Sequence, residues 1–148
     1  MSKRVYKKPN RIELGKQQEL SLIAHRMGSE HPDKEATWYA IGCYWYAKGE
    51  FEAACKCFSK TRGSLEGCAA FGHTFARRNE HDQAIAAYRM TFRLHPASPQ
   101  IPMFLGMELL KQGELGEASS FFNISLKLDG TNPFLYNECG MYFFTRGE

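Results

Sequence analysis

Four glycines recur along the chain at a nearly constant interval. They are 30, 34 and 34 residues apart, and they are Gly42, Gly72, Gly106 and Gly140. Each lies in a segment whose apolar residues are spaced three and four apart, as in Trp38-Ile41-Trp45, which places them on one stripe of a helix. A glycine inside a helix costs about 1 kcal/mol relative to alanine. Four glycines at one register therefore predict that a neighbouring helix passes too close to leave room for a Cβ.

A second register follows the first three glycines. Small residues lie twelve positions after them, namely Ala54, Ala84 and Ala118. Aromatic residues lie four positions further on, namely Phe58, Tyr88 and Phe122. A small side chain lets a second helix approach the first, and an aromatic side chain one turn later fills the space beside it. The two registers together predict pairs of closely packed helices.

Turn residues lie between the two helices of each predicted pair. A glycine or asparagine is followed by glutamate at Gly49-Glu50, Asn79-Glu80, Gly113-Glu114 and Gly147-Glu148. Gly and Asn readily take the left-handed conformation that ends a helix, so these dipeptides predict tight turns. Pro32 and Pro96 mark the exits of second helices, because proline stops helix propagation.

The period is that of the tetratricopeptide repeat, in which two antiparallel helices form each unit. We therefore predict an all-α protein, an α-α superhelix built as a tetratricopeptide-repeat solenoid. The repeats are expected near 35–64, 65–98 and 99–132, with a half repeat at 133–148 and the second helix of a preceding repeat at 15–32. Residues 1–14 are expected to be a basic, partly ordered arm, because of Pro9 and the clustered charges. The half repeat favours a fragment, or a last helix that packs on something else.

Charge and cysteine content limit the functional classes. Five basic residues precede the first acidic one, Glu13, which leaves 14 basic and 16 acidic residues in the rest of the chain. No basic face for nucleic acid is therefore expected. The most apolar stretch, 38–47, has about half the length that a membrane span needs. Five cysteines, an odd number, favour free thiols in a reducing compartment, and we expect a soluble protein inside the cell.

One segment narrows the interpretation. Residues 79–88 read Asn-Glu-His-Asp-Gln-Ala-Ile-Ala-Ala-Tyr, and 72–76 read Gly-His-Thr-Phe-Ala. With 38–44 and 132–134, they resemble the cell division cycle sixteen family of anaphase-promoting complex subunits, from about Glu19 to Glu148. The resemblance implies a non-catalytic scaffold of a cell-cycle ubiquitin ligase, found in the nucleus and cytoplasm, that binds other subunits of the complex.

The family also implies a small partner subunit whose N-terminal segment threads through a concave groove. A homodimer is implied as well, although the family's dimer contacts lie in a long N-terminal repeat array, in whose place this chain has its basic start. In such solenoids the first helix of each repeat lines the groove. The candidate groove residues are Tyr39, Cys43, Tyr46, His73, Arg77, Met103, Met107, Asn137 and Met141. Met adapts to irregular peptide surfaces, and Tyr and His add hydrogen bonds.

The sequence also bears on three other functions: peptide binding as a co-chaperone, metal binding and catalysis. A co-chaperone or peptide-binding adaptor would hold a carboxylate with Lys and Asn where this chain has Tyr39 and Cys43. Cys55 and Cys57, two apart on a helix, diverge by about 200° and cannot grip one metal ion together. Cys43 and His73 could approach each other, but no oxyanion donors or orienting acid accompany them. We therefore expect no metal, no cofactor and no enzymatic activity.

Overall fold

The computed structural model describes residues 11–61, 63–131, 133, 136–137, 140–141 and 144. This part of the chain contains seven α-helices and no β-strand. They are α1 (Arg11–Glu30), α2 (Glu35–Ala47), α3 (Phe51–Phe58), α4 (Leu65–Arg77), α5 (His81–Leu94), α6 (Gln100–Lys111) and α7 (Leu115–Leu128). Within the described residues, no helix is both long and apolar enough to cross a bilayer. The chain divides into two compact units, residues 1–60 and 61–148.

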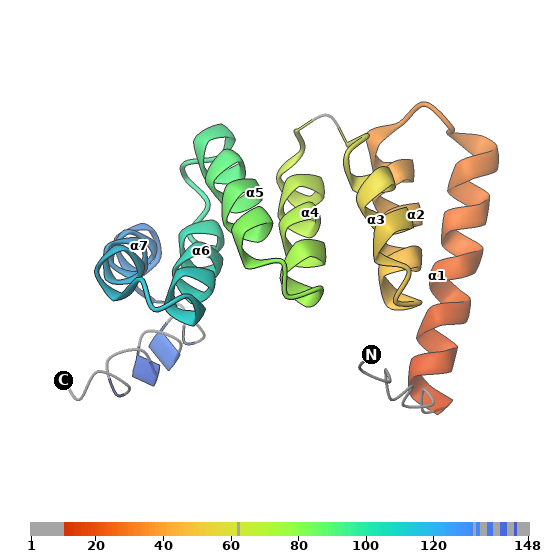
Figure 1. The fold of residues 1–148 in the computed structure, drawn as a ribbon. Coiled ribbons are helices and arrows are strands. Elements are labelled where there is room, and N and C mark those ends of the chain that lie inside the picture. Colours follow the sequence, from red (N-terminus) through yellow and green to blue (C-terminus); the bar gives the residue numbers. More distant parts are fainter. Residues whose placement is uncertain are drawn as a thin grey trace. The chain divides into compact units, whose positions relative to one another are not determined.

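The first unit contains α1, α2 and α3, with α2 packed against both of the others (Figure 1). Its buried residues include Ala24 of α1, Thr37 of α2 and Phe58 of α3. Helix α1 begins at Arg11, four residues before the predicted start of 15. The physical reason is that Arg, Glu and Leu in 11–14 are good helix formers and most of the basic cluster lies upstream of them.

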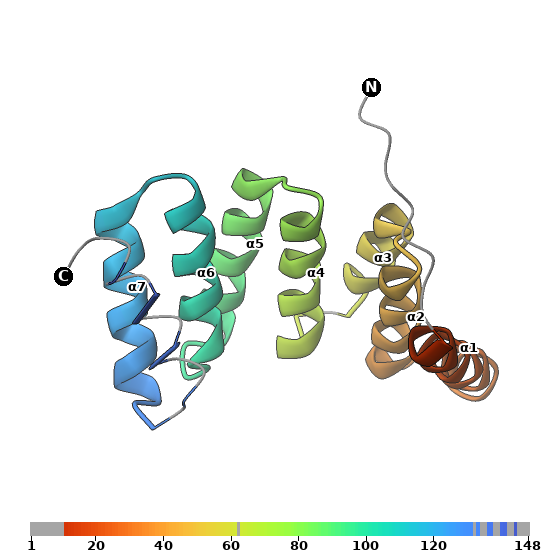
Figure 2. The same cartoon turned by 90° about the horizontal axis from the view of Figure 1, so that it is seen from below.

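The second unit contains α4 to α7, and each helix packs against the next along the chain (Figure 2). These helices share one apolar core. Its buried members are Ala84, Ile85, Tyr88, Ile101, Met103, Leu105, Leu109, Ala118 and Phe122. Helix α4 has a side-chain cap, because the Ser64 hydroxyl accepts a hydrogen bond from the backbone N–H of Gly67 at 3.2 Å.

The turns inside the helical pairs have one conformation. Gly49, Asn79 and Gly113 have φ values of 80°, 58° and 80°. The residue after each, as at Glu80, donates its backbone N–H to a carbonyl five residues earlier, at 3.0 Å from Phe75 O. The predicted turns at these three positions are confirmed, while Gly147-Glu148 lies outside the described residues.

The recurring glycines are contact points for aromatic rings. A Cβ added at Gly42 or Gly72 would lie 2.5 Å from Cε1 of Phe58 or Tyr88, respectively, and one at Gly106 would lie 3.1 Å from Cε1 of Phe122. The sequence predicts that the neighbouring helix itself excludes the Cβ, whereas in the structure the space is taken by the aromatic ring that this helix carries. Ala54, Ala84 and Ala118, which precede these rings by one turn, are fully buried. A Cβ at Gly140 would meet nothing within 4 Å, so no such ring contact exists there in the described structure.

Candidate functional site

His73 lies where three helices of the second unit meet. Its Nδ1 is 2.5 Å from the Tyr88 hydroxyl of α5, and its ring packs edge-on against Phe104 of α6 with 4.5 Å between ring centroids. Burial lowers the pKa of His73, and the nearby carboxylate of Glu108 raises it by a smaller amount. The imidazole is therefore favoured in its neutral form, hydrogen-bonded to Tyr88 within its own repeat and in ring contact with Phe104 of the next repeat.

Glu108 supplies a buried carboxylate next to His73. The residue is only 3% exposed, and each of its oxygens has a partner. Nδ1 of His81, at the start of α5, is 2.6 Å from Oε2, and Nζ of Lys111 is 2.8 Å from Oε1. Glu108 thus joins the second helix of one repeat to the first helix of the next, as expected for a buried charge that needs hydrogen-bonded partners.

The other candidate groove residues of α4 and α6 differ in accessibility. Arg77, the last residue of α4, is exposed, and Met107 is partly buried against the core. Met103 is 0% exposed and belongs to the core, so its predicted place in a binding groove is wrong in this structure. Ile101 and Pro102, which precede Met103 in the first turn of α6, are buried as well, so Met103 lies in a covered part of the helix.

In the first unit the candidate groove residues lie against aromatic rings. Tyr39 is 36% exposed and its ring centroid is 6.0 Å from that of Phe58. Tyr46 packs edge-on against Phe51 at 5.5 Å. Burial raises the pKa of the Cys43 thiol, and a hydrogen bond with Tyr39 opposes this in part. The two tyrosines and Cys43 thus form part of the α2 surface, and their role in binding stays a prediction.

The candidates near the C-terminus are exposed. Asn137 and Met141 are both helical, and Met141 is 67% exposed. Neither residue belongs to the apolar core of the second unit that includes Met103. Their place in a binding surface therefore also stays a prediction.

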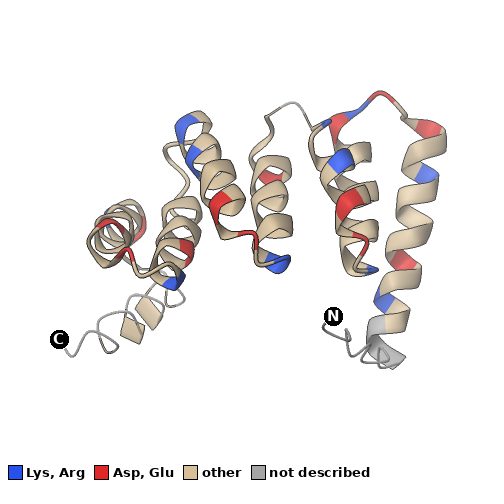
Figure 3. Cartoon of the chain, in the orientation of Figure 1, with Lys and Arg blue, Asp and Glu red and all other residues tan. Residues whose placement is uncertain are grey.

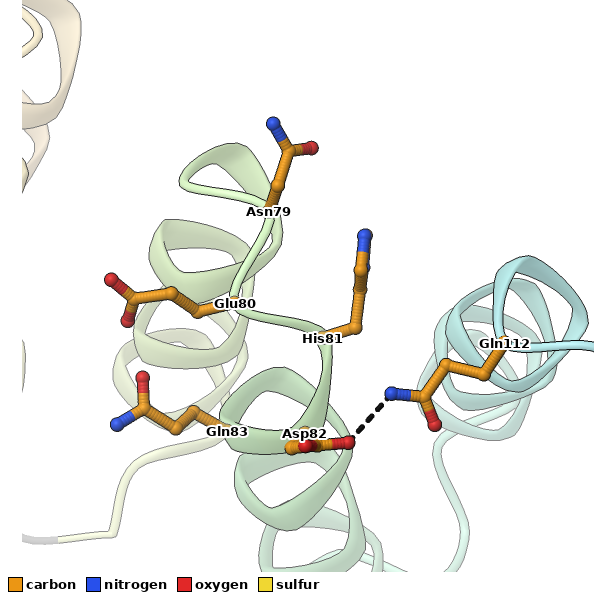
Figure 4. Close-up of a pocket in the computed structure, with 6 residues that line it drawn as sticks. All are labelled: Asn79, Glu80, His81, Asp82, Gln83 and Gln112. Carbon is orange, nitrogen blue, oxygen red and sulfur yellow. Dashed lines mark hydrogen bonds between the residues drawn. The ribbon is translucent and has the colours of Figure 1, made fainter. Parts of the chain in front are cut away.

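A polar pocket of about 350 Å³ lies at the turn between α4 and α5 (Figure 4). Its lining residues are Asn79, Glu80, His81, Asp82, Gln83 and Gln112. Asp82 accepts a hydrogen bond from Nε2 of Gln112 at 2.6 Å, which connects α5 to the residue after α6. None of the candidate groove residues lines this pocket. Residues 79–83 belong to the segment that carries the family resemblance, and Asn79-Glu80 was also predicted as a turn, whereas Gln112 was not singled out from the sequence.

The site has little of the chemistry that catalysis needs. Burial raises the pKa of Cys43, Cys57 and Cys68, which favours the protonated, weakly nucleophilic thiol. Among the described residues, no group of three or more His, Cys, Asp or Glu side chains is arranged to hold a metal ion.

The sequence did not predict the roles that Tyr88 and Glu108 have in the site. Tyr88 was assigned to helix packing alone, although its hydroxyl also fixes His73. Glu108 was not singled out. Its signal was present, since a lone carboxylate stands among Leu105, Leu109 and other apolar residues of one helix, a place where a charge needs partners.

The chain is similar in sequence to several known proteins. No protein-family model matches the sequence. The chain is 33% identical over 142 residues to anaphase-promoting complex subunit 6 of Arabidopsis thaliana, covering 93% of this chain and 26% of that protein. It is 34% identical over 140 residues to the subunit cut9 of Schizosaccharomyces pombe, covering 92% and 21%. The cell division cycle protein 16 homolog of Homo sapiens is 30% identical over 142 residues, covering 93% and 23%.

The chain is homologous to Cdc16-type subunits. A crystal structure of the anaphase-promoting complex hetero-tetramer Cut9–Hcn1 matches it with a TM-score of 0.81 at 33% identity, covering 90% of this chain and 26% of that one. The predicted resemblance and the predicted fold class, a tetratricopeptide-repeat solenoid, are thereby confirmed. The chain spans about a quarter of the length of these Cdc16-type relatives.

Proposed function

We propose that this chain is a non-catalytic scaffold segment of an anaphase-promoting complex. The observation that carries the proposal is the similarity to Cdc16-type subunits over 93% of the chain. A Cut9 chain of this type forms a hetero-tetramer with Hcn1. Raised thiol pKa values at Cys43, Cys57 and Cys68 support a binding function over a nucleophilic one.

The proposed binding surface is the one that α4 and α6, the first helices of the two repeats in the second unit, present, and its proposed occupant is a segment of a small partner subunit. The contact between His73 and Phe104 supports this, because it brings a side chain of α4 against a side chain of α6. Residues further along the two helices, Arg77 and Met107, are exposed or partly exposed and are available to another chain. A homodimer and residence in the nucleus and cytoplasm are part of the same proposal.

Purification of the tagged chain from its source cells, followed by mass spectrometry, tests the assignment to the complex. We expect other ligase subunits to be recovered in amounts comparable to the bait. Recovery of chaperones without ligase subunits would instead favour a co-chaperone. Fractionation of the same cells tests the nuclear and cytoplasmic location, and light scattering of the purified chain tests the dimer.

A pair of substitutions tests the binding surface. Arg77→Ala with Met107→Ala removes two side chains of the second unit that the proposal places against the partner, and we expect weaker binding of the small subunit recovered above. Met90→Ala is the matched control, because Met90 is 61% exposed on the second helix of a repeat. Unchanged affinity in the double variant, with helical content retained by circular dichroism, would place the partner elsewhere.

A further inference from the structure

Helices α4 and α6 each carry a basic residue in their last turn, Arg77 and Lys111, respectively. Arg77 follows His73 by four residues, and Lys111 follows Phe104 by seven, so each lies on the same helix face as the earlier residue. Because the His73 and Phe104 rings are in contact, these two faces adjoin. We call the surface formed by His73, Arg77, Phe104, Met107 and Lys111 the α4–α6 seam.

One of the two positive charges of the seam, that of Arg77, has no ion-pair partner in the described part of the chain, whereas Lys111 pairs with Glu108. Arg77 is exposed and has no salt-bridge partner among the described residues, whereas the next residue, Arg78, pairs with Glu80 at 2.9 Å. Glu108 contacts the seam through Lys111, and its two oxygens are occupied by His81 and Lys111. Figure 3 shows basic residues where α4 and α6 end.

The two cations also remain accessible. The Lys111 side chain is 50% exposed even while it pairs with Glu108, and Arg77 is exposed at the last turn of α4. Next to them the seam offers apolar surface, since Phe104 and Met107 are only partly buried. A partner that placed a neutral or basic group here would leave the Arg77 charge unpaired or repelled, whereas a carboxylate would pair with it.

We infer that the partner segment carries an aspartate or glutamate beside an apolar side chain, with its carboxylate held by Arg77 and Lys111 and its apolar side chain on Phe104 and Met107. This inference rests on the proposed function, because it assigns the chemistry of the segment that lies on the seam. An acidic peptide fits this surface better than a nucleic acid does. A single-stranded nucleic acid requires aromatic stacking platforms that alternate with many cations, and the seam has two cations.

Fluorescence anisotropy with defined peptides tests the inference. The probes are fluorescein-labelled peptides of about 12 residues, long enough to span neighbouring helices, with Leu and Met around a central Asp-Asp, Asn-Asn or Lys-Lys pair. We expect the Asp peptide to bind about 2- to 10-fold more tightly than the Asn peptide, as partly exposed ion pairs allow. That preference should disappear in the variant with both Arg77→Gln and Lys111→Gln.

The matched control changes Arg93→Gln and Lys127→Gln, which are exposed basic residues in the last turns of α5 and α7. This control should keep the preference for the Asp peptide.

The remaining outcomes separate the inference from the proposed function. If the Asn peptide binds wild type as tightly as the Asp peptide, the inference is wrong while binding on the seam stands. If a uridine oligonucleotide competes better than the Asp peptide, the seam binds nucleic acid instead. If no peptide binds, peptide binding on the seam fails together with the inference.

Discussion

Tyr88 of α5 lies so close to Gly72 of α4 that a Cβ on Gly72 would stand 2.5 Å from the ring carbon Cε1. The Tyr88 hydroxyl is held in turn by His73, so the ring cannot move aside without losing that hydrogen bond. We predict that Gly72→Ala destabilises the second unit by about 1–3 kcal/mol, the usual cost of overpacking a core. Urea unfolding followed by circular dichroism measures it.

The control for this change is Gly15→Ala. Gly15 lies inside α1, and a Cβ there would meet nothing within 4 Å. Because alanine favours a helix over glycine by about 1 kcal/mol, Gly15→Ala should leave stability unchanged or raise it. Equal losses at Gly15 and Gly72 would show that contact with Tyr88 is not the reason why glycine stands at position 72.

Ala84 gives a second test of the helix pairs. It is 0% exposed, and four residues later on the same helix Tyr88 fills the space against Gly72. We predict that Ala84→Leu costs about 1–3 kcal/mol, because the larger side chain has no space to enter. Ala86→Leu, two residues away on the exposed face of α5, is the control and should change stability by less than about 0.5 kcal/mol. A melting temperature for Ala84→Leu at or above that of wild type contradicts the helix register.

The periodic features of the fold could be predicted from the sequence. Helix starts at Glu35 and Leu65 match the predicted repeat boundaries, and the third repeat, expected from 99, has its first helix from Gln100. Turn positions such as Asn79 could be predicted because few residues tolerate a positive φ, and Asn is one of them. Helix starts and turns depend on residues close together in the sequence, so a repeated sequence pattern is enough to predict them.

The candidate site was less predictable, because it depends on contacts between repeats. Met103 and Met107 both occupy first-helix positions expected to line a groove, yet Met103 is fully buried and Met107 only partly. The difference arises from how closely α6 is covered at its start, which no spacing within one repeat specifies. The link from Glu108 to His81 joins residues 27 apart in different repeats, so it too is invisible to a search for local motifs.

His73 predicts a pH dependence of stability. Burial lowers its pKa below the ordinary value of 6.5, so the folded protein favours the neutral imidazole more than the unfolded chain does. Its contribution is therefore fully present above about pH 6.5 and is lost as the pH falls from there through the lower folded pKa. The groups that face it are the Tyr88 hydroxyl, the Phe104 ring and, at longer range, the Glu108 carboxylate.

The measurement compares wild type with His73→Gln at about pH 7.5 and about pH 5 by urea unfolding. Glutamine keeps a hydrogen-bonding group near Tyr88 but does not titrate. We expect wild type to lose more stability than His73→Gln between the two pH values, because the other four histidines are common to both proteins. An equal loss in the two proteins would mean that His73 titrates alike in the folded and unfolded states.

Glu108 provides the test of how adjacent repeats are joined. Its buried carboxylate accepts hydrogen bonds from His81 at 2.6 Å and from Lys111 at 2.8 Å, whereas the amide of Glu108→Gln would turn an NH₂ group toward one of these two donors. We predict a loss of about 1–3 kcal/mol, because one donor is then left without its acceptor in a largely buried place. Glu114→Gln, on the exposed turn between α6 and α7, is the control and should be nearly silent. Because Glu108 also pairs with Lys111, its replacement leaves the seam more positive, so the Asp peptide should bind this variant at least as tightly as wild type while the fold is weakened.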